Sequence, residues 1–461
     1  MKRILIVGAG VSGLATAFCL QQLAPAVEFT VLEQRERVGG NAWTEQRDGF
    51  QVELGPNGFL DNKPSTVQLC RDLGIGDQLI PASEAAGKNR YLFLDGKLKR
   101  LPAGLLDLAR TDLLSWRGKL RLLTESWRRP ADNAGESIDA FVRRRAGPEA
   151  ADVLADALVT GIHGGDPALL SVRAAFPRLA AFEEQYGSVM KGMSSSAKQR
   201  RAEAQARGEV YQRGSRMWSF RDGLRLLVQT LRNHLRRPPL LGVNVRRITR
   251  RDDGWVVHGP DQESWSADAV VLACPAYEQA KVLADLDATL AGRIGGIAYN
   301  RIAVVALGYR AADAPRPPDG FGFIAPQRTR RDILGVQWCS TIFPDRAPSG
   351  SILIRALCGG WHRADVVDWD DTRLVDAVCA EVRLAMGITA APCFTHIVRW
   401  DRAIPQYQLG HGERVAAVME QAGTHRGLFL TGNAYHGVAL NDCTEQAGLT
   451  ANRVADFLRG A

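Results

Sequence analysis

Residues 2–33 read KRILIVGAGVSGLATAFCLQQLAPAVEFTVLE, and their order of apolar, glycine-rich and acidic positions is specific. An apolar run, Lys2–Val7, enters Gly8-Ala9-Gly10-Val11-Ser12-Gly13 and is followed by Leu14–Gln22, which is typical of a helix. A second apolar stretch, Phe29–Leu32, ends on Glu33. A strand, a glycine turn, a helix and a second strand that ends on an acid form the βαβ unit that binds an ADP moiety.

Each part of this fingerprint has a physical role. Gly8 permits the tight turn, Gly10 lets backbone N–H groups reach a pyrophosphate, and Gly13 lets the helix and strand pack closely. The helix N-terminus, at Val11-Ser12, offers unpaired N–H groups and the positive end of a dipole to the phosphates. The Glu33 carboxylate, followed by Gln34, can accept hydrogen bonds from both ribose hydroxyls.

A secretory signal peptide is the alternative interpretation of the same residues. Lys2 and Arg3 precede the weakly polar stretch Ile4–Leu20, as in an exported protein. Three glycines and Ser12 interrupt that stretch at the fingerprint spacing, however, and Glu33 is explained only by the nucleotide fold. We therefore expect a protein that is not exported.

Length and composition agree with a cytoplasmic enzyme. The 461 residues are enough for two or three domains, and 46% hydrophobic with 23% charged residues is ordinary for a globular protein. The sequence contains no apolar stretch of about 18 residues, the length that a membrane span needs. The eight cysteines are scattered without a CxxC pair, so we expect free thiols and no metal site.

The net charge of +8 is concentrated in two segments. Residues 88–129 hold eleven Lys and Arg against four Asp and Glu, and residues 191–225 hold nine against three. A solvated helical surface explains this, and so does attraction to anionic lipid or to an acidic substrate. Nucleic acid is not expected, because no binding module is recognisable. Apolar residues at rough helical spacing lie in the first segment, as in an interfacial or a core-facing helix: Leu105, Leu106, Leu108, Leu113, Leu114, Trp116, Leu120, Leu123 and Trp127.

Two further glycine-rich turns are expected to lie at the nucleotide site. Arg37-Val38-Gly39-Gly40 can approach phosphate or flavin, and Glu53–Phe59, with Gly55 and Pro56, is expected to line the same cleft. Residues 65–179 show mostly helical patterns with breaks at prolines. Residues 194–214 are polar and basic, so we expect a mobile loop or a frayed helix there.

Strand patterns return in the second half of the chain. We expect strands at Leu241–Ile248, Trp255–Val257, Ala269–Ala273, Ile302–Leu307, Gly322–Ala325, Gly335–Cys339 and Ile352–Leu357, and a helix at Asp371–Met386. The chain closes with a strand and tight turn at Gly427–Asn433 and a helix at Thr444–Arg459.

This return to a strand, a glycine turn and a helix favours FAD over a nicotinamide, because FAD extends beyond the ADP site. The last helix, with its N-terminus near Gly437-Val438, can direct its dipole at the flavin edge that becomes negative on reduction. We therefore predict an α/β protein with a glutathione-reductase-type FAD-binding Rossmann fold, a mixed-sheet substrate domain and a helical insertion.

Several stretches resemble the protoporphyrinogen and coproporphyrinogen oxidases of haem synthesis. They are Asn89-Arg90-Tyr91, residues 161–167 (GIHGGDP), Leu170–Pro177 (LSVRAAFP), Ser219–Leu224 (SFRDGL), Ile404–His411 (IPQYQLGH) and Gly427–Cys443. The resemblance covers nearly the full length. It implies an FAD enzyme that oxidises a porphyrinogen with dioxygen and releases hydrogen peroxide.

The resemblance also implies roles for individual residues. Arg37 and Gly40 match the phosphate-proximal turn, Val245 matches a strand residue whose backbone meets the adenine, and Gly432, Asn433, Gly437 and Val438 match the flavin and pyrophosphate end. Arg90 matches an arginine that pairs with a propionate. Phe321, Gly322, Ile324 and Leu357 match the pocket around the macrocycle, with Asn57 in a nearby turn.

These roles suit an apolar disc with anionic groups at one edge, which needs flat apolar walls and a bidentate cation at the rim. Simpler explanations remain open. Arg90 also fits the basic surface, and Phe321 and Leu357 also fit a plain core. His163, His436, Asn441 and Asn41-Ala42-Trp43 depart from the family pattern. His436 has the alternative interpretation of a catalytic base.

The sequence thus predicts a protoporphyrinogen oxidase, with coproporphyrinogen as the alternative substrate. An amine oxidase or carotenoid-type desaturase on the same fold, and a flavin-binding carrier without turnover, are the other hypotheses. No catalytic side chain is expected, because the flavin carries the chemistry. We expect FAD-binding parts at residues 1–80, 215–290 and 401–461, a helical region at 81–214 and a mixed-sheet domain at 291–400. A peripheral contact with the cytoplasmic face of a membrane and a homodimer are both compatible with the sequence.

Overall fold

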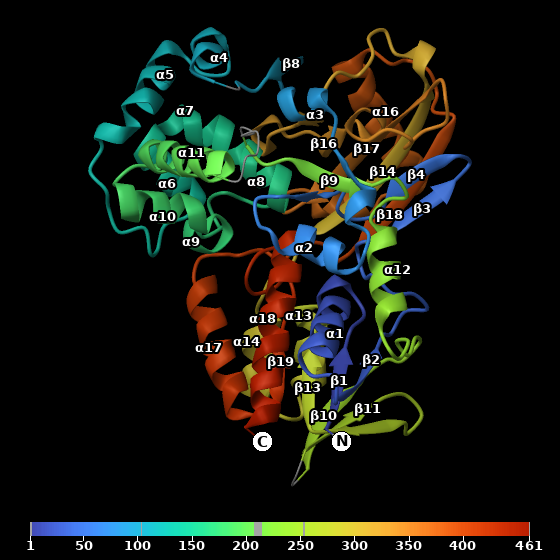
Figure 1. Cartoon of the computed structure of the whole chain (residues 1–461). Coiled ribbons are helices and arrows are strands. Elements are labelled where there is room, and N and C mark those ends of the chain that lie inside the picture. The colour runs from blue at the N-terminus through green and yellow to red at the C-terminus, as the bar shows by residue number, and fades with distance from the viewer. Residues whose placement is uncertain (1, 103, 207–213, 252–253, 461) are drawn as a thin grey trace.

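The computed structural model describes residues 2–102, 104–206, 214–251 and 254–460. Figure 1 shows both ends of the chain at the lower end of the molecule, beside a small sheet flanked by long helices. The upper part holds a larger sheet on one side and a group of short helices on the other. The two ends of the chain therefore build one part of the protein together.

The lower sheet is parallel and has the strand order β19-β13-β1-β2. Its strands are β1 (Arg3–Val7), β2 (Glu28–Leu32), β13 (Ala269–Leu272) and β19 (Leu428–Leu430). Ile4 lies opposite Ala269, and Val270 lies opposite Leu428, so the central strand pairs join the first and last parts of the chain. The predicted return of the C-terminus to the nucleotide fold is confirmed.

Both faces of this sheet are covered, which explains why its strands are continuous apolar runs. Ile4 and Ile6 face a core shared with α1 (Val11–Leu23), α2 (Ser65–Asp72), α12 (Arg225–His234) and α18 (Leu440–Arg459). Leu5 and Val7 face the opposite core. That core is built from β10 (Arg247–Arg251), β11 (Gly254–His258), β12 (Ser264–Ala267), α13 (Ala276–Leu283), α14 (Ala288–Gly295) and α17 (His411–Thr424).

The upper sheet has seven strands in the order β18-β14-β17-β16-β15-β7-β8. They are β7 (Tyr91–Leu94), β8 (Lys97–Arg100), β14 (Arg301–Arg310), β15 (Gly322–Ile324), β16 (Ile333–Gln337), β17 (Ser351–Gly360) and β18 (Phe394–Trp400). α16 (Asp371–Met386) covers one face through Leu374, Val378 and Val382. The other face is left for the functional site.

Shorter elements complete the molecule. β3 (Thr44–Arg47) pairs with β4 (Phe50–Glu53), and β5 (Phe59–Leu60) and β6 (Leu79–Pro81) flank β9 (Met217–Phe220). Short helices connect them: η1 (Gly76–Gln78), α3 (Glu84–Lys88), η4 (Ala311–Asp313), η5 (Gln327–Thr329), α15 (Cys339–Ile342) and η6 (Ala364–Asp368).

The helical region consists of short pieces. They are α4 (Leu105–Arg110), α5 (Trp116–Leu123), η2 (Thr124–Trp127), α6 (Ile138–Ala146), α7 (Pro148–Ala150), a π-helical turn η3 (Ala151–Ala155), α8 (Asp156–His163), α9 (Val172–Ala175), α10 (Pro177–Tyr186) and α11 (Val189–Ala206). The apolar residues of 105–127 therefore do not form one amphipathic helix. Leu108, Leu113 and Leu114 are buried, whereas Trp116 and Trp127 are exposed.

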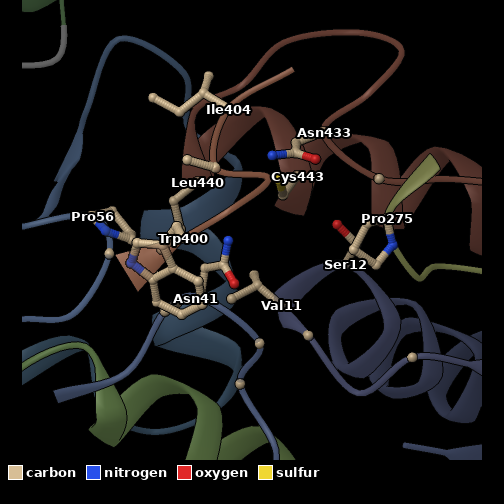
Figure 2. Close-up of a pocket in the computed structure, with 18 of the residues that line it drawn as sticks. Val11, Ser12, Asn41, Pro56, Pro275, Trp400, Ile404, Asn433, Leu440 and Cys443 are labelled. Atoms are coloured by element: carbon tan, nitrogen blue, oxygen red, sulfur yellow. The ribbon is translucent and has the colours of Figure 1, made fainter. Parts of the chain in front are cut away.

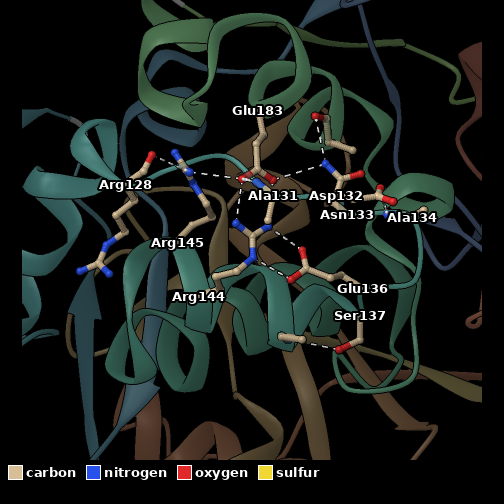
Figure 3. A network of polar contacts seen from close by, with 12 residues as sticks. Arg128, Ala131, Asp132, Asn133, Ala134, Glu136, Ser137, Arg144, Arg145 and Glu183 are labelled. Atoms are coloured by element: carbon tan, nitrogen blue, oxygen red, sulfur yellow. Dashed lines mark hydrogen bonds and ion pairs between the residues drawn. The ribbon is translucent and has the colours of Figure 1, made fainter.

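A buried ion network holds these short helices together (Figure 3). Arg145 of α6 donates to the Glu125 carboxylate over 2.6 Å and to that of Glu183 over 3.2 Å. Arg144 bridges Glu183 and Glu136. Arg145, Glu125 and Glu183 are each at most 2% exposed. Three segments distant in sequence thus meet at one set of charges.

Three sequence predictions are wrong in detail. Of the two expectations for residues 194–214, the mobile loop is wrong for residues 194–206, which belong to the helix α11, where Gly192 and Ala204 are buried. Residues 207–213 lie outside the described residues. The predicted strand Leu241–Ile248 begins only at Arg247, since residues 243–245 line the cavity instead. Within the range expected to be mostly helical, β6, β7 and β8 are strands. The other predicted strands and both predicted helices are confirmed.

Candidate functional site

One cavity of about 480 Å³ begins at the carboxyl ends of the parallel strands and extends to the free face of the seven-stranded sheet. In Figure 2, Asn433 and Cys443 come from the C-terminal segment and lie across from Ser12 and Pro275. Trp400, the last residue of β18 in the other sheet, and Ile404, in the segment after that strand, also line the cavity. The crevice outside the carboxyl ends of parallel strands is where α/β sheets bind ligands.

The three glycines of the fingerprint have different surroundings. A Cβ at Gly13 would lie 1.9 Å from the carbonyl oxygen of Gly8, and a Cβ at Gly8 would lie 2.8 Å from the backbone nitrogen of Cys274. A Cβ at Gly10 would meet no protein atom within 4 Å. Gly8 and Gly13 are therefore required by the packing of the protein, whereas Gly10 keeps space open for a ligand. This is the cradle that a pyrophosphate needs.

Glu33 is held at the end of β2 with its carboxylate fixed. The backbone N–H of Ala9 donates to one carboxylate oxygen over 2.7 Å, and that of Arg35 donates to the other over 3.0 Å. The side chain is buried and lines the cavity. A fixed acceptor at this edge suits the ribose of an ADP moiety.

The turn after Glu33 is held by two guanidinium groups. Arg37 and Arg35 both donate to the carbonyl oxygen of Gly40, over 3.0 and 3.1 Å. Arg37 stacks on Trp43 at 4.7 Å, which gives a reason for the unusual tryptophan at this position. Gly40 lines the cavity, whereas Arg37 does not, so Arg37 shapes the turn rather than facing the ligand.

The C-terminal turn lies between β19 and α18. Gly432, Asn433 and Val438 line the cavity, and Gly437 does not. A Cβ at Gly437 would lie 2.3 Å from the Asp442 side chain, so this glycine serves close packing. α18 begins at Leu440, slightly later than the position near Gly437-Val438 at which its N-terminus was expected.

Asn441, which departs from the family pattern, has a structural role. Its side-chain amide donates to the carbonyl oxygen of Leu60 over 3.3 Å and contacts the side chain of Asn62. It therefore ties the first turn of α18 to the segment after β5. His436 is exposed and lies outside the cavity lining, so the geometry does not support a role as a base.

The second half of the cavity has an apolar floor with one polar end. Ile302, Val304 and Leu357 project from neighbouring strands, with Val304 opposite Leu357 in the register. Arg355, on the same face of β17, donates to the side-chain oxygen of Gln337 over 2.6 Å. Asn57 and Ile162 close the sides. This chamber accepts a flat apolar molecule.

The structure brings most of the predicted site residues together. The cavity is lined by Gly8, Gly10, Val11, Ser12, Glu33, Gln34, Gly39, Gly40, Gly55, Pro56, Val245, Gly432, Asn433 and Val438, and by Asn57 and Leu357 on the substrate side. Gly13, Arg37 and Gly437 lie behind the lining. Arg90, Phe321, Gly322 and Ile324 do not line it either.

The four substrate-side residues outside the cavity lie in, or directly before, the neighbouring strands β7 and β15 of the seven-stranded sheet. Arg90 is exposed and its guanidinium stacks on Phe321 at 5.1 Å. Gly322 is in β15, paired with Gln337. Ile324 contacts α8, because a Cβ at Gly161 would lie 2.7 Å from its Cδ1. Ile162, the next residue of that helix, does line the cavity.

Sequence reasoning missed several lining residues. Pro275, Tyr277, Trp400, Gln337 and Arg355 line the cavity but belong to no recognised motif. Ile404 also lines it, and although it opens the stretch IPQYQLGH, it was not assigned to the site. Pro275 follows the predicted strand Ala269–Ala273 directly, so its place at the carboxyl end of that strand was a usable signal. Tyr277 is in α13, Ile404 follows β18, and the other three are in the seven-stranded sheet, so only the tertiary structure brings them to the site.

The residues present fit FAD. Gly10 and Glu33 would hold the ADP moiety, the turns at Gly40 and Gly55 and the C-terminal turn would enclose the rest of the cofactor, and Ile302 and Leu357 would exclude water beyond it. When bound, FAD supplies hydride acceptance from a substrate and subsequent reoxidation. Among the described residues, no three His, Cys, Asp or Glu side chains gather as a metal site would require.

A dinucleotide cradle joined to an apolar chamber and closed by both ends of the chain defines a flavin-dependent oxidoreductase. The comparisons agree. A sequence profile described as flavin containing amine oxidoreductase matches residues 11–455, and the chain belongs to this family. It is an FAD-dependent oxidoreductase, and its resemblance to the porphyrinogen oxidases within this family is confirmed.

Two relatives and one solved structure illustrate the similarity. The chain is 32% identical to protoporphyrinogen oxidase, chloroplastic, from Nicotiana tabacum, over 98% of this chain and 85% of that protein. It is 27% identical to coproporphyrinogen III oxidase from Bacillus subtilis, over 99% and 98%. The crystal structure of a proposed protoporphyrinogen oxidase from Exiguobacterium sp. 255-15 superposes with a TM-score of 0.83 at 25% identity, covering 98% of each chain.

Two buried histidines beside the site predict a loss of stability in acid. Burial lowers the pKa of His163 and of His411 from 6.5 to about 4. Because their folded-state pKa values are depressed, the neutral forms stabilise the fold fully above pH 6.5, and this contribution is lost as the pH falls toward 4. We expect the free energy of unfolding to fall by up to about 3 kcal/mol for each histidine.

Denaturant titrations at pH 7.0 and 4.5 measure this loss. His163→Phe removes one of the two groups while it keeps an aromatic ring against Phe176 and Tyr407. Its stability should therefore depend less on pH than that of the wild type. An equal dependence in both proteins would contradict the assignment to His163.

Proposed function

We propose that this protein oxidises protoporphyrinogen IX to protoporphyrin IX, with dioxygen as the final acceptor and hydrogen peroxide as the second product. Coproporphyrinogen III, converted to coproporphyrin III, is the alternative substrate. The observation that carries the proposal is the cavity itself, in which the FAD cradle opens onto the apolar floor of Ile302, Val304 and Leu357. The names of the relatives in tobacco and Bacillus subtilis support the same substrate class.

The side chains act in this reaction by orientation. A porphyrinogen is an apolar macrocycle, puckered at its saturated bridge carbons, with carboxylates at its edge, so an apolar floor can bind its face and a polar end can receive a carboxylate. Binding against this floor would hold a saturated bridge carbon of the macrocycle close to the bound cofactor. Proximity of this kind lowers the barrier without a nucleophilic side chain.

The test is turnover of both porphyrinogens by the purified holoenzyme. Oxygen uptake and the appearance of porphyrin fluorescence are measured side by side, with cyclohexylamine and putrescine as amine substrates. We expect oxygen uptake with a porphyrinogen and none with either amine. Uptake with an amine alone would favour an amine oxidase, and binding of the porphyrinogen without oxygen uptake would favour a carrier; either result would overturn the proposal.

Leu357→Arg tests the floor directly. The half-buried Leu357 faces the cavity opposite Val304, so a guanidinium group there fills the chamber with charge. We expect porphyrinogen turnover to fall by at least about a hundredfold, because the apolar contact with the macrocycle is lost. FAD content, measured by absorbance, should remain that of the wild type. Full turnover in this variant would show that the substrate binds elsewhere.

Arg90 is the proposed partner of a substrate propionate that extends past the cavity edge. Arg90→Ala should raise the KM of the porphyrinogen about tenfold and leave kcat nearly unchanged, because the contact exists equally in the ground and transition states. Arg100→Ala, which removes another exposed cation of the same region, is the matched control. Equal KM values for Arg90→Ala and the wild type would remove Arg90 from the site.

We also propose a peripheral membrane contact through the outer face of α4, α5 and η2. Leu106, Trp116 and Trp127 are 76%, 69% and 83% exposed, and Leu120 and Leu123 lie between them on α5. Arg110, Arg117, Arg121 and Arg129 are exposed among these apolar side chains. Apolar side chains ringed by cations suit the interface of an anionic bilayer. No described helix is long and apolar enough to cross a membrane.

Vesicle flotation tests this contact. We expect binding to vesicles that contain phosphatidylserine, weaker binding to pure phosphatidylcholine, and release at high salt. Replacing Trp116, Leu120 and Trp127 with serine should abolish the binding. Leu384→Ser, on the distant helix α16, removes an equally exposed leucine and is the control. Flotation of the triple variant to the same extent as the wild type would contradict the proposed membrane contact.

A further inference from the structure

The turn between β19 and α18 forms the C-terminal wall of the FAD site, yet it has an irregular backbone. Gly432 and Gly437 have φ angles of +123° and +110°, conformations that L side chains rarely adopt. Asn433 and Val438 line the cavity from within this turn. An irregular turn can hold ligand-facing groups in place only if other parts of the protein fix it.

The hydroxyl group of Tyr407 joins the two ends of this turn. It donates to the carbonyl oxygen of Asn433 over 2.5 Å and accepts from the backbone N–H of Gly437 over 2.8 Å. Tyr407 is 1% exposed, so both hydrogen bonds are shielded from water. No other single side-chain atom among the described residues bonds both Asn433 and Gly437.

Tyr407 is itself held from three directions. Its ring stacks on His411 with centroids 4.1 Å apart, and the ring of His163 lies 6.1 Å away. Its carbonyl oxygen accepts from the backbone N–H of Ser171, at the start of α9. Burial raises the pKa of the Tyr407 hydroxyl well above 10, so the group keeps the proton that it donates to Asn433.

The opposite side of the same turn is fixed by a second buried polar group. The Tyr435 hydroxyl donates to the side-chain oxygen of Gln279 over 2.6 Å. The Gln279 amide in turn donates to the carbonyl oxygens of Cys274 and Thr431, at the ends of β13 and β19. The turn is therefore anchored to the sheet on one side, and the Tyr407 hydroxyl joins its cavity-lining end to its helix end.

We propose that Tyr407 is a positioning residue for FAD. It does not line the cavity, and it acts by holding Asn433 and the backbone up to Val438 in the geometry that encloses the cofactor. Loss of the hydroxyl leaves a buried N–H and a buried carbonyl without a partner, and the turn relaxes to satisfy them. The inference concerns the cofactor site and holds whichever substrate is oxidised.

Tyr407→Phe removes the hydroxyl and keeps the ring that stacks on His411. Apoprotein is titrated with FAD, and quenching of flavin fluorescence gives the dissociation constant. We expect it to rise about tenfold, because two buried hydrogen bonds to the turn are lost, with a shift in the visible absorption bands of the bound flavin. Tyr309→Phe, which removes a buried hydroxyl that contacts Cys379 of α16 on the far face of the seven-stranded sheet, should bind FAD like the wild type.

The apoprotein Tm separates positioning from a general structural role. The Tm values of Tyr407→Phe and Tyr309→Phe should agree within a few degrees. A large drop in Tm for Tyr407→Phe with an unchanged FAD dissociation constant would overturn the proposal, and so would wild-type affinity and spectrum. Should the variant not fold, hydrogen exchange at the Gly437 amide of the wild-type holoenzyme decides: slow exchange supports the bridge, and exchange at the rate of an exposed amide refutes it.

Discussion

Replacing Gly10 with valine is expected to abolish FAD binding and to leave the apoprotein folded. Gly10 has φ and ψ angles of −70° and 179°, which valine adopts without strain. Its Cβ would meet no protein atom, so the added side chain occupies only the space of the cofactor. We expect the FAD dissociation constant to rise by about a thousandfold or more, a loss of about 4 kcal/mol.

Gly13→Ala is the matched control with the opposite outcome. Its Cβ would lie 1.9 Å from the carbonyl oxygen of Gly8, so α1 has to move away from β1. This change should lower the stability of the apoprotein and cause loss of soluble protein. Absorbance of bound flavin and the Tm of the apoprotein separate the two cases. A colourless, unstable Gly10→Val protein would show that Gly10 is needed for packing after all.

Replacing Arg145 with methionine is expected to cost about 3–5 kcal/mol of stability, because it leaves a buried carboxylate without its partner. Glu125 and Glu183 both depend on this guanidinium, which also donates to the carbonyl oxygen of Gly187 over 3.0 Å. The network joins η2, α6, α10 and the start of α11, beneath the exposed apolar surface of α5 and η2. Its loss should loosen the whole helical region.

Arg143→Met, two positions earlier on the same helix, is the control. Arg143 is 42% exposed and pairs with Asp139 and Asp152 at the surface, where ion pairs contribute about 1 kcal/mol or less. Denaturant unfolding followed by circular dichroism measures both variants. Similar stabilities would contradict the role of the network, whereas flavin content should stay unchanged in both because the network lies away from the FAD cradle (Figure 1).

Replacing Gly10 affects the part of the chain proposed to bind the cofactor, whereas replacing Arg145 affects the helical region. Gly10 and Glu33 act through backbone geometry close to their own positions in the sequence. Arg145 acts by joining segments that are tens of residues apart. Interactions of the second kind are visible only after folding.

The sequence alone determined the nucleotide half of the protein. A strand, a glycine turn and a helix are local structures, and the close approach of Gly13 to Gly8 and the hydrogen bond of Ala9 to Glu33 span at most 24 residues. The roles of Gly10 and Glu33 could therefore be predicted from the sequence. The return of the segment that contains Gly432 and Asn433 to the same sheet could be predicted as well. The apolar runs of β1 and β13 were equally clear, since both faces of their sheet are buried.

The substrate half was decided by the tertiary structure. Ile302, Leu357 and Arg355 form one floor only because β14, β17 and β16 pair in a fixed register, and no local pattern specifies which strands pair. The same register leaves Phe321 and Ile324 beside the cavity rather than in it. Tyr407, too, reaches Asn433 and Gly437 across a gap of 26 and 30 residues. Contacts between distant segments depend on packing of the whole chain, which residue spacing does not encode.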